Sequence, residues 1–274
     1  MNDPAKTQNP TLDPDADVRV VVRDKYGAIA AGKSSDCCGV ACGCNGGDVD
    51  QVLGAIGYTA DQAATIPADA NLGLGCGNPV ALAEIRPGET VLDLGSGAGI
   101  DCFLAARAAG PTGRAIGVDM TAAMIERARA NATRSGASNV EFRLGEIEHL
   151  PVADASVDMV ISNCVVNLSP DKPQVFREAL RALKPGGRLM VSDLVLLRPL
   201  GPELQRSVDL YVGCVAGAAL RDDYLRMMRE AGFASVEVVK EHRYEVGLDS
   251  LPADSPERQA FEVVVSVTVR ARKA

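Results

Sequence analysis

The second half of the chain alternates short apolar runs with stretches of helical periodicity. Runs rich in β-branched residues predict strands at residues 90–94, 114–119, 139–144, 157–162 and 187–193. Apolar residues spaced three or four apart predict helices between these strands, near residues 99–109, 121–135 and 171–183. Strands that alternate with crossover helices form a parallel sheet. The pattern therefore predicts an α/β fold with a doubly wound sheet.

The pattern is less regular beyond residue 194. A polar-capped helical segment is predicted around residues 202–213 and a helix near residues 221–231. Strands near residues 234–241 and 261–270 would then extend the sheet to seven strands, most of them parallel. We interpret the segment at about residues 195–220 as an insertion after the fifth strand.

The first third of the chain has a different composition. Residues 1–17 are rich in Pro, Asp and Asn without periodicity, which predicts a disordered leader. A Cys-rich extension is predicted over residues 18–88, in which residues 18–26 could be a short strand or the start of a helix. Gly, Ser and Cys dominate residues 31–49 and indicate a loop. The principal domain is expected to span residues 89–274.

Charge and cysteine content narrow the functional classes. The 274-residue chain carries 28 Lys and Arg against 36 Asp and Glu, which gives a formal net charge of −8. We therefore expect neither nucleic acid nor an anionic membrane surface as a partner. The amino terminus lacks a basic segment followed by an apolar run, and no stretch approaches the roughly 18 apolar residues of a membrane span. We expect a cytoplasmic protein, in which eight cysteines indicate metal, metalloid or redox chemistry.

A glycine turn follows the first predicted strand of the principal domain. It reads Gly95-Ser96-Gly97-Ala98-Gly99, and residues without a Cβ let a ligand approach backbone N–H groups closely. A dinucleotide fingerprint would place a glycine at position 100, which is Ile. The sequence instead has D-x-G-x-G-x-G and resembles motif I of class I S-adenosylmethionine-dependent methyltransferases. The resemblance implies S-adenosylmethionine as the cofactor, in a site that includes Asp93, Gly95, Ser96, Gly97 and Gly99.

Further positions match the order of such a cofactor site. Asp119 ends the second strand, where its carboxylate could accept hydrogen bonds from both ribose hydroxyls, with Met120 beside the adenine. Glu146 and Ile147 stand in GEIE before HLP, which looks like the family's segment that borders the adenine. Asn163 ends the fourth strand, at the edge where open parallel sheets bind ligands. A solvated aspartate at a strand end is the alternative interpretation of Asp119.

Three cysteines are expected near this cofactor. Cys164 follows Asn163 directly, Cys76 lies in the loop GLGCGNP, and Cys214 lies in LYVGCVAGAAL within the insertion. These segments, together with DLGSGAGIDC, the VDM after the second strand and SNCVVNLSPDK, resemble arsenite S-adenosylmethionine methyltransferases. The resemblance implies that Cys76, Cys164 and Cys214 bind trivalent arsenic, supplied as arsenite. It also implies that the enzyme methylates this arsenic, which serves arsenic detoxification.

The chemistry of thiols suits this acceptor. Trivalent arsenic is a soft centre, and soft centres select thiolate ligands over imidazole or carboxylate. Three sulfurs satisfy its pyramidal geometry and leave a lone pair, which can attack the sulfonium methyl with no proton to remove. A general base is then unnecessary. The chain has two histidines, His149 and His242, and we assign a role to neither.

The other cysteines comprise a core candidate and an amino-terminal group. Cys102 follows the glycine turn and is predicted to be buried in the core. Family members use a further cysteine near the amino terminus, which can pair with the loop cysteine as a disulfide during turnover. Cys38 or Cys44 is the candidate here, and Cys37 and Cys42 stay open. A thiol reductant such as thioredoxin or glutathione would then restore the thiols.

Three alternatives compete with these assignments. The amino-terminal cysteines could form a separate zinc or iron–sulfur site, although they lack paired C-x2-C knuckles. The same fold could methylate a small organic acceptor, such as a quinone or a sterol precursor, with the cysteines incidental. A noncatalytic thiol protein could sequester arsenite. The glycine turn and Asp119 argue against sequestration, because a scavenger needs no cofactor pocket.

Overall fold

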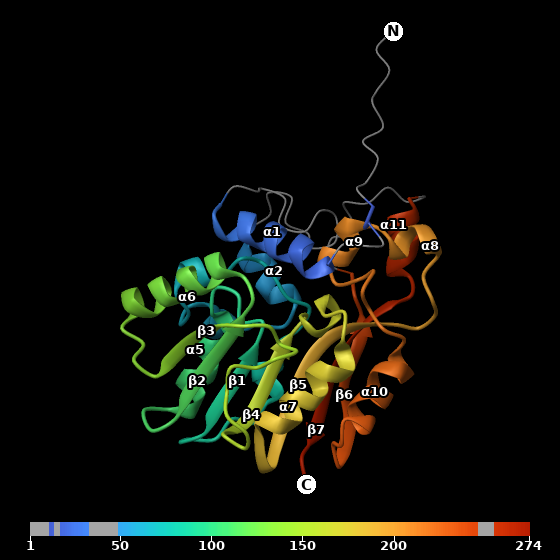
Figure 1. The fold of residues 1–274 in the computed structure, drawn as a ribbon. Helices are drawn as coiled ribbons and strands as arrows, with labels where there is room; N and C mark the ends of the chain where they lie inside the picture. Colours follow the sequence, from blue (N-terminus) through green and yellow to red (C-terminus); the bar gives the residue numbers. More distant parts are fainter. Residues whose placement is uncertain (1–10, 14–16, 33–48, 246–254) are drawn as a thin grey trace.

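A seven-stranded sheet forms the centre of the protein (Figure 1). The computed structural model describes residues 11–13, 17–32, 49–245 and 255–274. The strands are β1 (Thr90–Leu94), β2 (Arg114–Asp119), β3 (Val140–Leu144), β4 (Val157–Asn163), β5 (Leu183–Leu196), β6 (Ser235–Arg243) and β7 (Val264–Arg272). Their order is β3-β2-β1-β4-β5-β7-β6, with β7 antiparallel to both of its neighbours and the other pairs parallel. The predicted α/β fold with a mostly parallel seven-stranded sheet is confirmed.

Two groups of helices pack on this sheet (Figure 1). The helices are α1 (Val18–Ala30), α2 (Val49–Ala55), α3 (Ala60–Ala63), α4 (Pro79–Leu82), α5 (Ile100–Ala109), α6 (Ala122–Ser135), α7 (Lys172–Ala182), α8 (Pro202–Gln205), α9 (Val208–Val212), α10 (Arg221–Glu230) and α11 (Pro256–Phe261). Helices α4 and α5 contact each other and the central strands, and α6 packs on β2 and β3. Helices α7 and α10 contact each other and pack on β5.

Alternate residues of β1 supply two separate hydrophobic cores. Leu92 and Leu94 pack with Phe176 of α7 and Tyr224 of α10. Val91 packs on the opposite side, in a cluster that includes Phe103 of α5. Side chains of successive strand residues point to opposite faces, so a strand buried on both faces is apolar throughout. Val91, Leu92 and Leu94 meet this requirement, and Asp93 is a carboxylate that the same strand buries.

The strand order reverses between β1 and β4. From β1 the chain passes to β2 on one side, and it later returns to place β4 on the other side of β1. In open α/β sheets such a reversal leaves a crevice at the carboxyl ends of the two strands, where ligands bind. Helix α1 lies over this end of the sheet and contacts α6 and α9 (Figure 1).

The amino-terminal segments differ in part from the sequence-based expectation. Residues 18–26, which could have been a strand or the start of a helix, belong to the helix α1. The Asp17 side chain caps this helix by accepting a hydrogen bond from Arg19 N. Within the predicted disordered leader, Thr11 pairs with Ser207 in an isolated bridge, and Leu12 N donates to the Arg206 carbonyl at 2.7 Å. Residues 1–10 and 14–16 of the leader, and Cys37, Cys38, Cys42 and Cys44, lie outside the described residues.

Several boundaries after β4 also differ from those expected. Strand β5 is longer than predicted at both ends, because Leu183 pairs with Val157 of β4 and the pairing with β7 continues to Leu196. The predicted helical segment at 202–213 divides into α8 and α9 at Ser207, whose hydroxyl caps α9. Helix α11 was not predicted, so β7 begins at Val264 rather than at residue 261. Its amino-terminal signal, Ser255 followed by Pro256, is present in the sequence.

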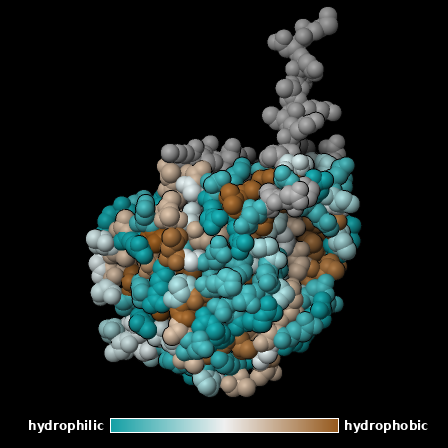
Figure 2. All heavy atoms as spheres, in the orientation of Figure 1, coloured by the Kyte–Doolittle hydropathy of each residue, from teal (hydrophilic) through white to brown (hydrophobic). Residues whose placement is uncertain are grey.

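The face of the molecule shown in Figure 2 is largely hydrophilic. Hydrophilic side chains cover much of the face shown in Figure 2, and hydrophobic ones are scattered among them. Within the described part of the chain, no helix is both long and apolar enough to traverse a lipid bilayer.

Candidate active site

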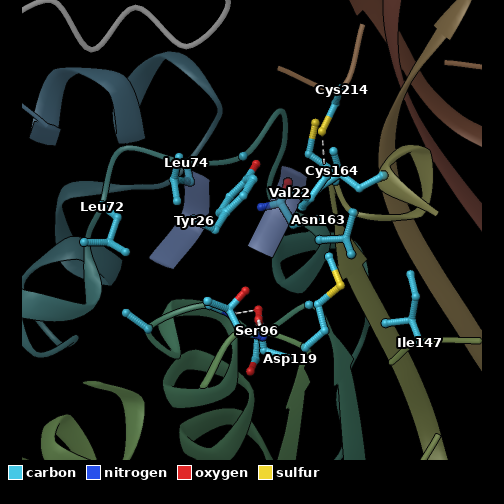
Figure 3. A pocket seen from close by; sticks show the side chains of 18 of the residues that line it. Val22, Tyr26, Leu72, Leu74, Ser96, Asp119, Ile147, Asn163, Cys164 and Cys214 are labelled. Atoms are coloured by element: carbon cyan, nitrogen blue, oxygen red, sulfur yellow. Dashed lines mark hydrogen bonds between the residues drawn. The ribbon is translucent and has the colours of Figure 1, made fainter. Parts of the chain in front are cut away.

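A large pocket opens at the carboxyl ends of the parallel strands (Figure 3). Its empty space, including the part open to solvent, is about 1170 Å³. That space suffices for a nucleoside-sized ligand and a small second substrate. The lining comes from α1, the loop before α4, the segments after β1, β2, β3 and β4, and the end of α9. Of the predicted cofactor residues, the structure places these at the pocket: Asp93, Gly95, Ser96, Gly97, Asp119, Met120, Ile147 and Asn163.

The glycine turn forms one wall of the pocket. At Gly95 the φ angle is 66°, and a Cβ there would lie 2.4 Å from the Val165 side chain, so the turn requires glycine. A Cβ at Gly97 would meet no protein atom within 4 Å, which leaves this space to a ligand. Gly99 does not line the pocket, contrary to its predicted role. It precedes α5 with a φ of 102° and packs where a side chain would collide with Phe103.

Asp119 supports the same turn from the end of β2. Its Oδ2 accepts a hydrogen bond from Gly97 N at 3.0 Å, and its Oδ1 accepts one from Thr121 N at 2.8 Å. Burial raises the pKa of this carboxyl, although both hydrogen bonds favour the charged form. Ser96 Oγ is buried and has no hydrogen-bond partner in the structure, and Ser96 lines the pocket. A ligand hydroxyl or amine would satisfy this atom.

The loop after β3 contributes Ile147 and Glu148 to the pocket, but not Glu146. The Glu146 carboxylate instead forms ion pairs with Arg19 at 3.1 Å and with Arg23 at 3.5 Å, both on α1. The structure therefore does not place Glu146, a predicted cofactor residue, at the pocket. The sequence could not reveal this pairing because α1 lies 127 residues earlier in the chain than Glu146.

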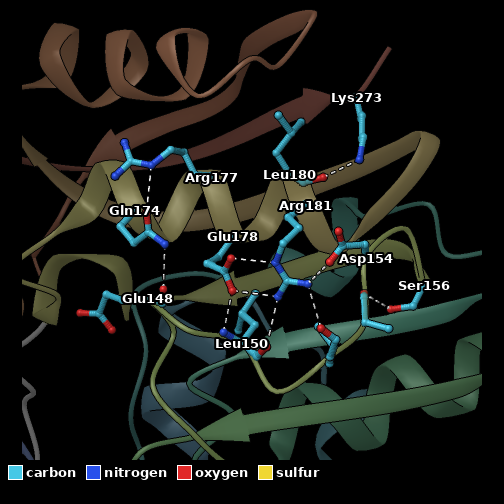
Figure 4. A network of polar contacts seen from close by, with 12 residues as sticks. Glu148, Leu150, Asp154, Ser156, Gln174, Arg177, Glu178, Leu180, Arg181 and Lys273 are labelled. Atoms are coloured by element: carbon cyan, nitrogen blue, oxygen red, sulfur yellow. Dashed lines mark hydrogen bonds and ion pairs between the residues drawn. The ribbon is translucent and has the colours of Figure 1, made fainter.

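Helix α7 holds this loop in place (Figure 4). Glu178 accepts a hydrogen bond from Leu150 N at 2.8 Å, and Arg181 donates to the Leu150 carbonyl at 3.1 Å. Gln174 Nε2 donates to the Glu148 carbonyl at 3.1 Å. These contacts fix the backbone on both sides of His149, so the pocket wall formed by Ile147 and Glu148 is supported by the scaffold.

Asn163 connects the cofactor pocket with the loop that carries Cys76. Its Oδ1 accepts a hydrogen bond from Cys76 N at 3.1 Å, and its Nδ2 lies 2.8 Å from the Gly77 carbonyl oxygen. The same Nδ2 lies 2.9 Å from Tyr58 Oη and 3.2 Å from Asp101 Oδ2. Asn163 therefore clamps the Cys76 loop to the end of β4, immediately before Cys164.

Carboxylates outnumber cations along the pocket wall. Asp93, Asp101, Asp119 and Glu148 line it, against the single guanidinium of Arg19 among the lining residues. Burial raises the pKa of Asp101 to about 6, although Tyr58 donates to this carboxyl at 2.7 Å. Such a wall suits a cationic ligand such as a sulfonium. Sequence reasoning missed Asp101, whose signal was a lone acidic residue in the otherwise apolar start IDCFLAA of α5.

Helix α1 covers the pocket from the side opposite the sheet. Val22 and Tyr26 face into it (Figure 3), and Tyr26 Oη donates to the Val212 carbonyl at 3.2 Å. Val212 precedes Cys214 by two residues, so α1 also contacts the segment that carries this cysteine. Sequence reasoning did not assign α1 to the site, because its apolar face is typical of any helix that packs on a core.

The three predicted acceptor cysteines come together beside this pocket. One donor atom each from Cys76, Cys164 and the Asp193 carboxyl all lie within 4.8 Å of one another. The Cys214 thiol donates to the Cys164 carbonyl oxygen at 2.7 Å, and Cys76 Sγ lies 3.6 Å from the Ser192 carbonyl oxygen. Cys164 and Cys214 line the pocket, whereas Cys76 is buried and only its neighbour in the chain, Gly75, lines it. All three thiols are free and buried.

Burial keeps these thiols protonated at neutral pH. It raises the pKa of Cys76 to about 11 and that of Cys164 well above its usual value. The pKa of Cys214 is raised mainly by its contact with Cys164 and then by burial. The cluster is therefore uncharged in the protein alone, and a ligand must replace the thiol protons.

Cys164 and Cys214 adopt an unusual backbone conformation. Their φ angles are 60° and 63°, in the left-handed region that glycine favours. A residue other than glycine in this conformation lowers the stability of the fold by about 1–3 kcal/mol. Such strained residues cluster at functional sites, where the surrounding structure fixes the direction of the side chain. By contrast Cys102 lies in α5 and is buried in the core, as predicted, with Sγ 3.4 Å from Asp93 Oδ2.

Comparison with known proteins places this arrangement in a family. A family model described as a methyltransferase domain matches residues 85–232. The chain is 48% identical to an arsenite methyltransferase of Halobacterium salinarum, over all of this chain and 71% of the relative. It is 37% identical to the human arsenite methyltransferase, over 60% of this chain and 46% of the relative. The chain thus spans about half the length of the human relative.

A solved structure agrees with these relatives. It is the crystal structure of an arsenic(III) S-adenosylmethionine methyltransferase from Chlamydomonas reinhardtii, which is 34% identical in sequence. The TM-score is 0.65, and the match covers 82% of this chain and 73% of the other. The chain therefore belongs to the arsenite methyltransferase family of S-adenosylmethionine-dependent methyltransferases.

Proposed function

We propose that the enzyme transfers the methyl group of S-adenosylmethionine to trivalent arsenic bound by Cys76, Cys164 and Cys214. The observation that carries the proposal is the convergence of these thiols, from three distant segments, beside one pocket that Cys164 and Cys214 line. Because the insertion at about residues 195–220 supplies Cys214, we assign the acceptor site to that insertion and to the loop before β1.

Arsenite can load this site without a base. Arsenous acid, As(OH)₃, condenses with three thiols to give As(S-Cys)₃ and three molecules of water. Each thiol proton leaves on a hydroxide of arsenic, so the raised pKa values of Cys76, Cys164 and Cys214 do not oppose the reaction. The bound arsenic is uncharged and keeps a lone pair, which suits a buried and weakly polar site.

The residues around the pocket suit the cofactor. We assign Asp119 to the ribose hydroxyls, and Met120 and Ile147 to the adenine. The carboxyls of Asp93 and Asp101 suit the positive charge of the methyl donor. When bound, S-adenosylmethionine supplies an electrophilic methyl group on a sulfonium. The protein then contributes by positioning, because holding the arsenic lone pair at near-attack distance from the methyl can supply roughly 7–11 kcal/mol.

Methyl transfer raises arsenic from the trivalent to the pentavalent level, since its lone pair forms the new As–C bond. The methyl donor leaves as S-adenosylhomocysteine. Return to a trivalent product takes two electrons, which two enzyme thiols supply as they join in a disulfide, and a thiol reductant such as thioredoxin or glutathione then reduces that disulfide. We assign the disulfide partner in this step to Cys38 or Cys44 of the amino-terminal extension. We also propose that the reaction serves arsenic detoxification in the cytoplasm, where the free thiols of the described chain would stay reduced.

The direct test is arsenic speciation. Purified enzyme is incubated with arsenite, S-adenosylmethionine and a thiol reductant, and arsenic species are separated by chromatography. We expect methylated arsenicals from the wild type and none from Cys164→Ser or Cys214→Ser. Cys102→Ser is the matched control, because Cys102 lies outside the cluster and serine keeps a donor toward Asp93. Cofactor binding without any methylated arsenic would favour an organic acceptor instead.

A further inference from the structure

Asp193 is a buried carboxylate at the arsenic site that the arsenic chemistry does not use. It lies in β5, is fully buried, and has a carboxyl oxygen within 4.8 Å of Cys76 Sγ and Cys164 Sγ. These two sulfurs are also within 4.8 Å of each other. Arsenic(III) takes its ligands from sulfur, so a hard oxygen donor beside the thiols calls for another explanation.

Hydrogen bonds hold this carboxyl in a fixed orientation. Its Oδ1 accepts from Asn167 Nδ2 at 2.8 Å and from Leu194 N at 2.9 Å, and its Oδ2 accepts from Tyr224 Oη at 3.1 Å. Carboxylates that bind metal ions are held by outer partners of this kind, which fix the direction of the remaining lone pairs.

The donor set matches a borderline cation better than it matches arsenic. Zinc accepts both thiolate and carboxylate ligands and forms tetrahedral sites, and open sites combine three protein ligands with one water molecule. Donor atoms around tetrahedral zinc are about 3.5–3.8 Å apart, from bond lengths of about 2.0–2.3 Å. The three donors here lie within 4.8 Å of one another, so they would move together by about 1 Å or less to reach that spacing.

Charge at the site also suits a divalent cation. Two thiolates and one carboxylate around Zn²⁺ leave one negative charge. Lys172 interacts electrostatically with Asp193, and its Nζ donates to the Asn167 and Ser169 carbonyls at 3.3 and 3.0 Å. Its ammonium would balance the negative charge of the zinc complex.

We propose that Cys76, Cys164 and Asp193 form a second, overlapping site that binds Zn²⁺, with water as the fourth ligand. On binding, the two thiols release two protons to solvent, and two Zn–S bonds and one Zn–O bond form. No redox change is involved. Because two sulfurs are common to both sites, Zn²⁺ and arsenite exclude each other. Zinc binding does not depend on the proposed function. Only the competition between Zn²⁺ and arsenite rests on the proposed function.

The two sites predict opposite responses from two variants. Zn²⁺ affinity is measured by competition with a colorimetric chelator, and arsenite binding by the arsenic retained after desalting. Both use full-length protein in which Cys37, Cys38, Cys42 and Cys44 are serine, so that the amino-terminal thiols do not contribute. Asp193→Asn should weaken Zn²⁺ binding by roughly tenfold or more while arsenite binding persists. Cys214→Ser should bind arsenite much more weakly and keep its Zn²⁺ affinity.

Asparagine at position 193 can keep the contacts to Asn167 and Leu194 through Oδ1, and S-adenosylmethionine affinity reports whether the fold is preserved.

Co²⁺ provides a readout that needs no variant. It should give tetrahedral visible bands and thiolate charge-transfer absorption, and arsenite should abolish both. Equal Zn²⁺ affinity in Asp193→Asn and its parent, or octahedral Co²⁺ without thiolate absorption, would overturn the proposal. Failure of methylation alone would leave the zinc results unaffected.

Discussion

The Cys214 thiol donates a hydrogen bond to the backbone carbonyl oxygen of Cys164, with the two atoms 2.7 Å apart. Both residues have left-handed backbone conformations, at φ angles of 63° and 60°. The bond joins the insertion after β5 to the end of β4, and Asn163 joins the Cys76 loop to the same point. The thiol cluster is therefore assembled in the protein before arsenic binds.

The backbone at Cys214 gives a stability prediction with an unusual sign. In ordinary helical positions alanine is more stable than glycine, by about 0.5–1 kcal/mol. At a φ of 63° the order should reverse, so that Cys214→Gly is more stable than Cys214→Ala by about 1 kcal/mol. Urea denaturation of the two variants measures the difference. Greater stability of the alanine variant would show that Cys214 bears no backbone strain.

Asn163 should act on arsenite binding through the Cys76 loop. Asn163→Ala removes the acceptor for Cys76 N and the donor near the Gly77 carbonyl, so the loop loosens. We expect a loss of arsenite affinity of about 1–3 kcal/mol, or roughly 5- to 150-fold.

Asn139→Ala is the matched control for Asn163→Ala. The Asn139 amide also donates to backbone carbonyls, those of Ala106 and Gly110 at 3.0 and 3.1 Å, but it lies outside the pocket lining. This variant should lower stability and leave arsenite affinity unchanged. Equal arsenite affinities in the two variants would show that the Asn163 clamp has no effect on the thiols.

Asp119 should govern cofactor affinity. Asp119→Ala removes the assigned ribose acceptor, and it also removes the contacts that hold Gly97 and Thr121. A hydrogen bond to a charged acceptor contributes about 1.5–3 kcal/mol, so calorimetry should show S-adenosylmethionine affinity weakened by roughly tenfold or more. The exposed Asp154, paired with Arg181, is the control, and its alanine variant should bind the cofactor normally. Unchanged affinity in Asp119→Ala would refute the ribose assignment.

Cofactor affinity should depend on pH through Asp101. Burial raises the pKa of Asp101 to about 6 in the protein alone. A cationic ligand favours the charged carboxylate, so affinity should rise as the pH increases through about 6 and level off above it. Asp101→Asn should bind more weakly at pH 7.5 and with a flatter pH profile. Identical profiles in the variant and the wild type would exclude Asp101 as a partner of the cationic cofactor.

The sequence predicted the sheet and most of the pocket because these depend on local signals. Strands β1, β2 and β4 are apolar runs, and Asp93, Asp119 and Asn163 stand where those runs end. The topology of a parallel sheet then places these three residues together at its carboxyl edge.

Contacts between distant segments could not be read in the same way. Glu146 stands beside Ile147 in the sequence, yet α1 draws its carboxylate away from the pocket through Arg19. Asp193 reads as an ordinary residue of a buried strand, and its place beside Cys76 appears only once the loop before α4 is fixed by Asn163. Such tertiary pairing leaves no periodic trace in the sequence.

The sulfur coordination of bound arsenic shows whether Cys76, Cys164 and Cys214 bind the same atom. X-ray absorption at the arsenic edge should be recorded on protein loaded with one arsenite per chain, in the background where Cys37, Cys38, Cys42 and Cys44 are serine. We expect three sulfur ligands in that background, and two sulfurs with one oxygen when Cys214 is also serine. Fewer than three sulfurs in the first sample, or three retained in the second, would contradict this expectation.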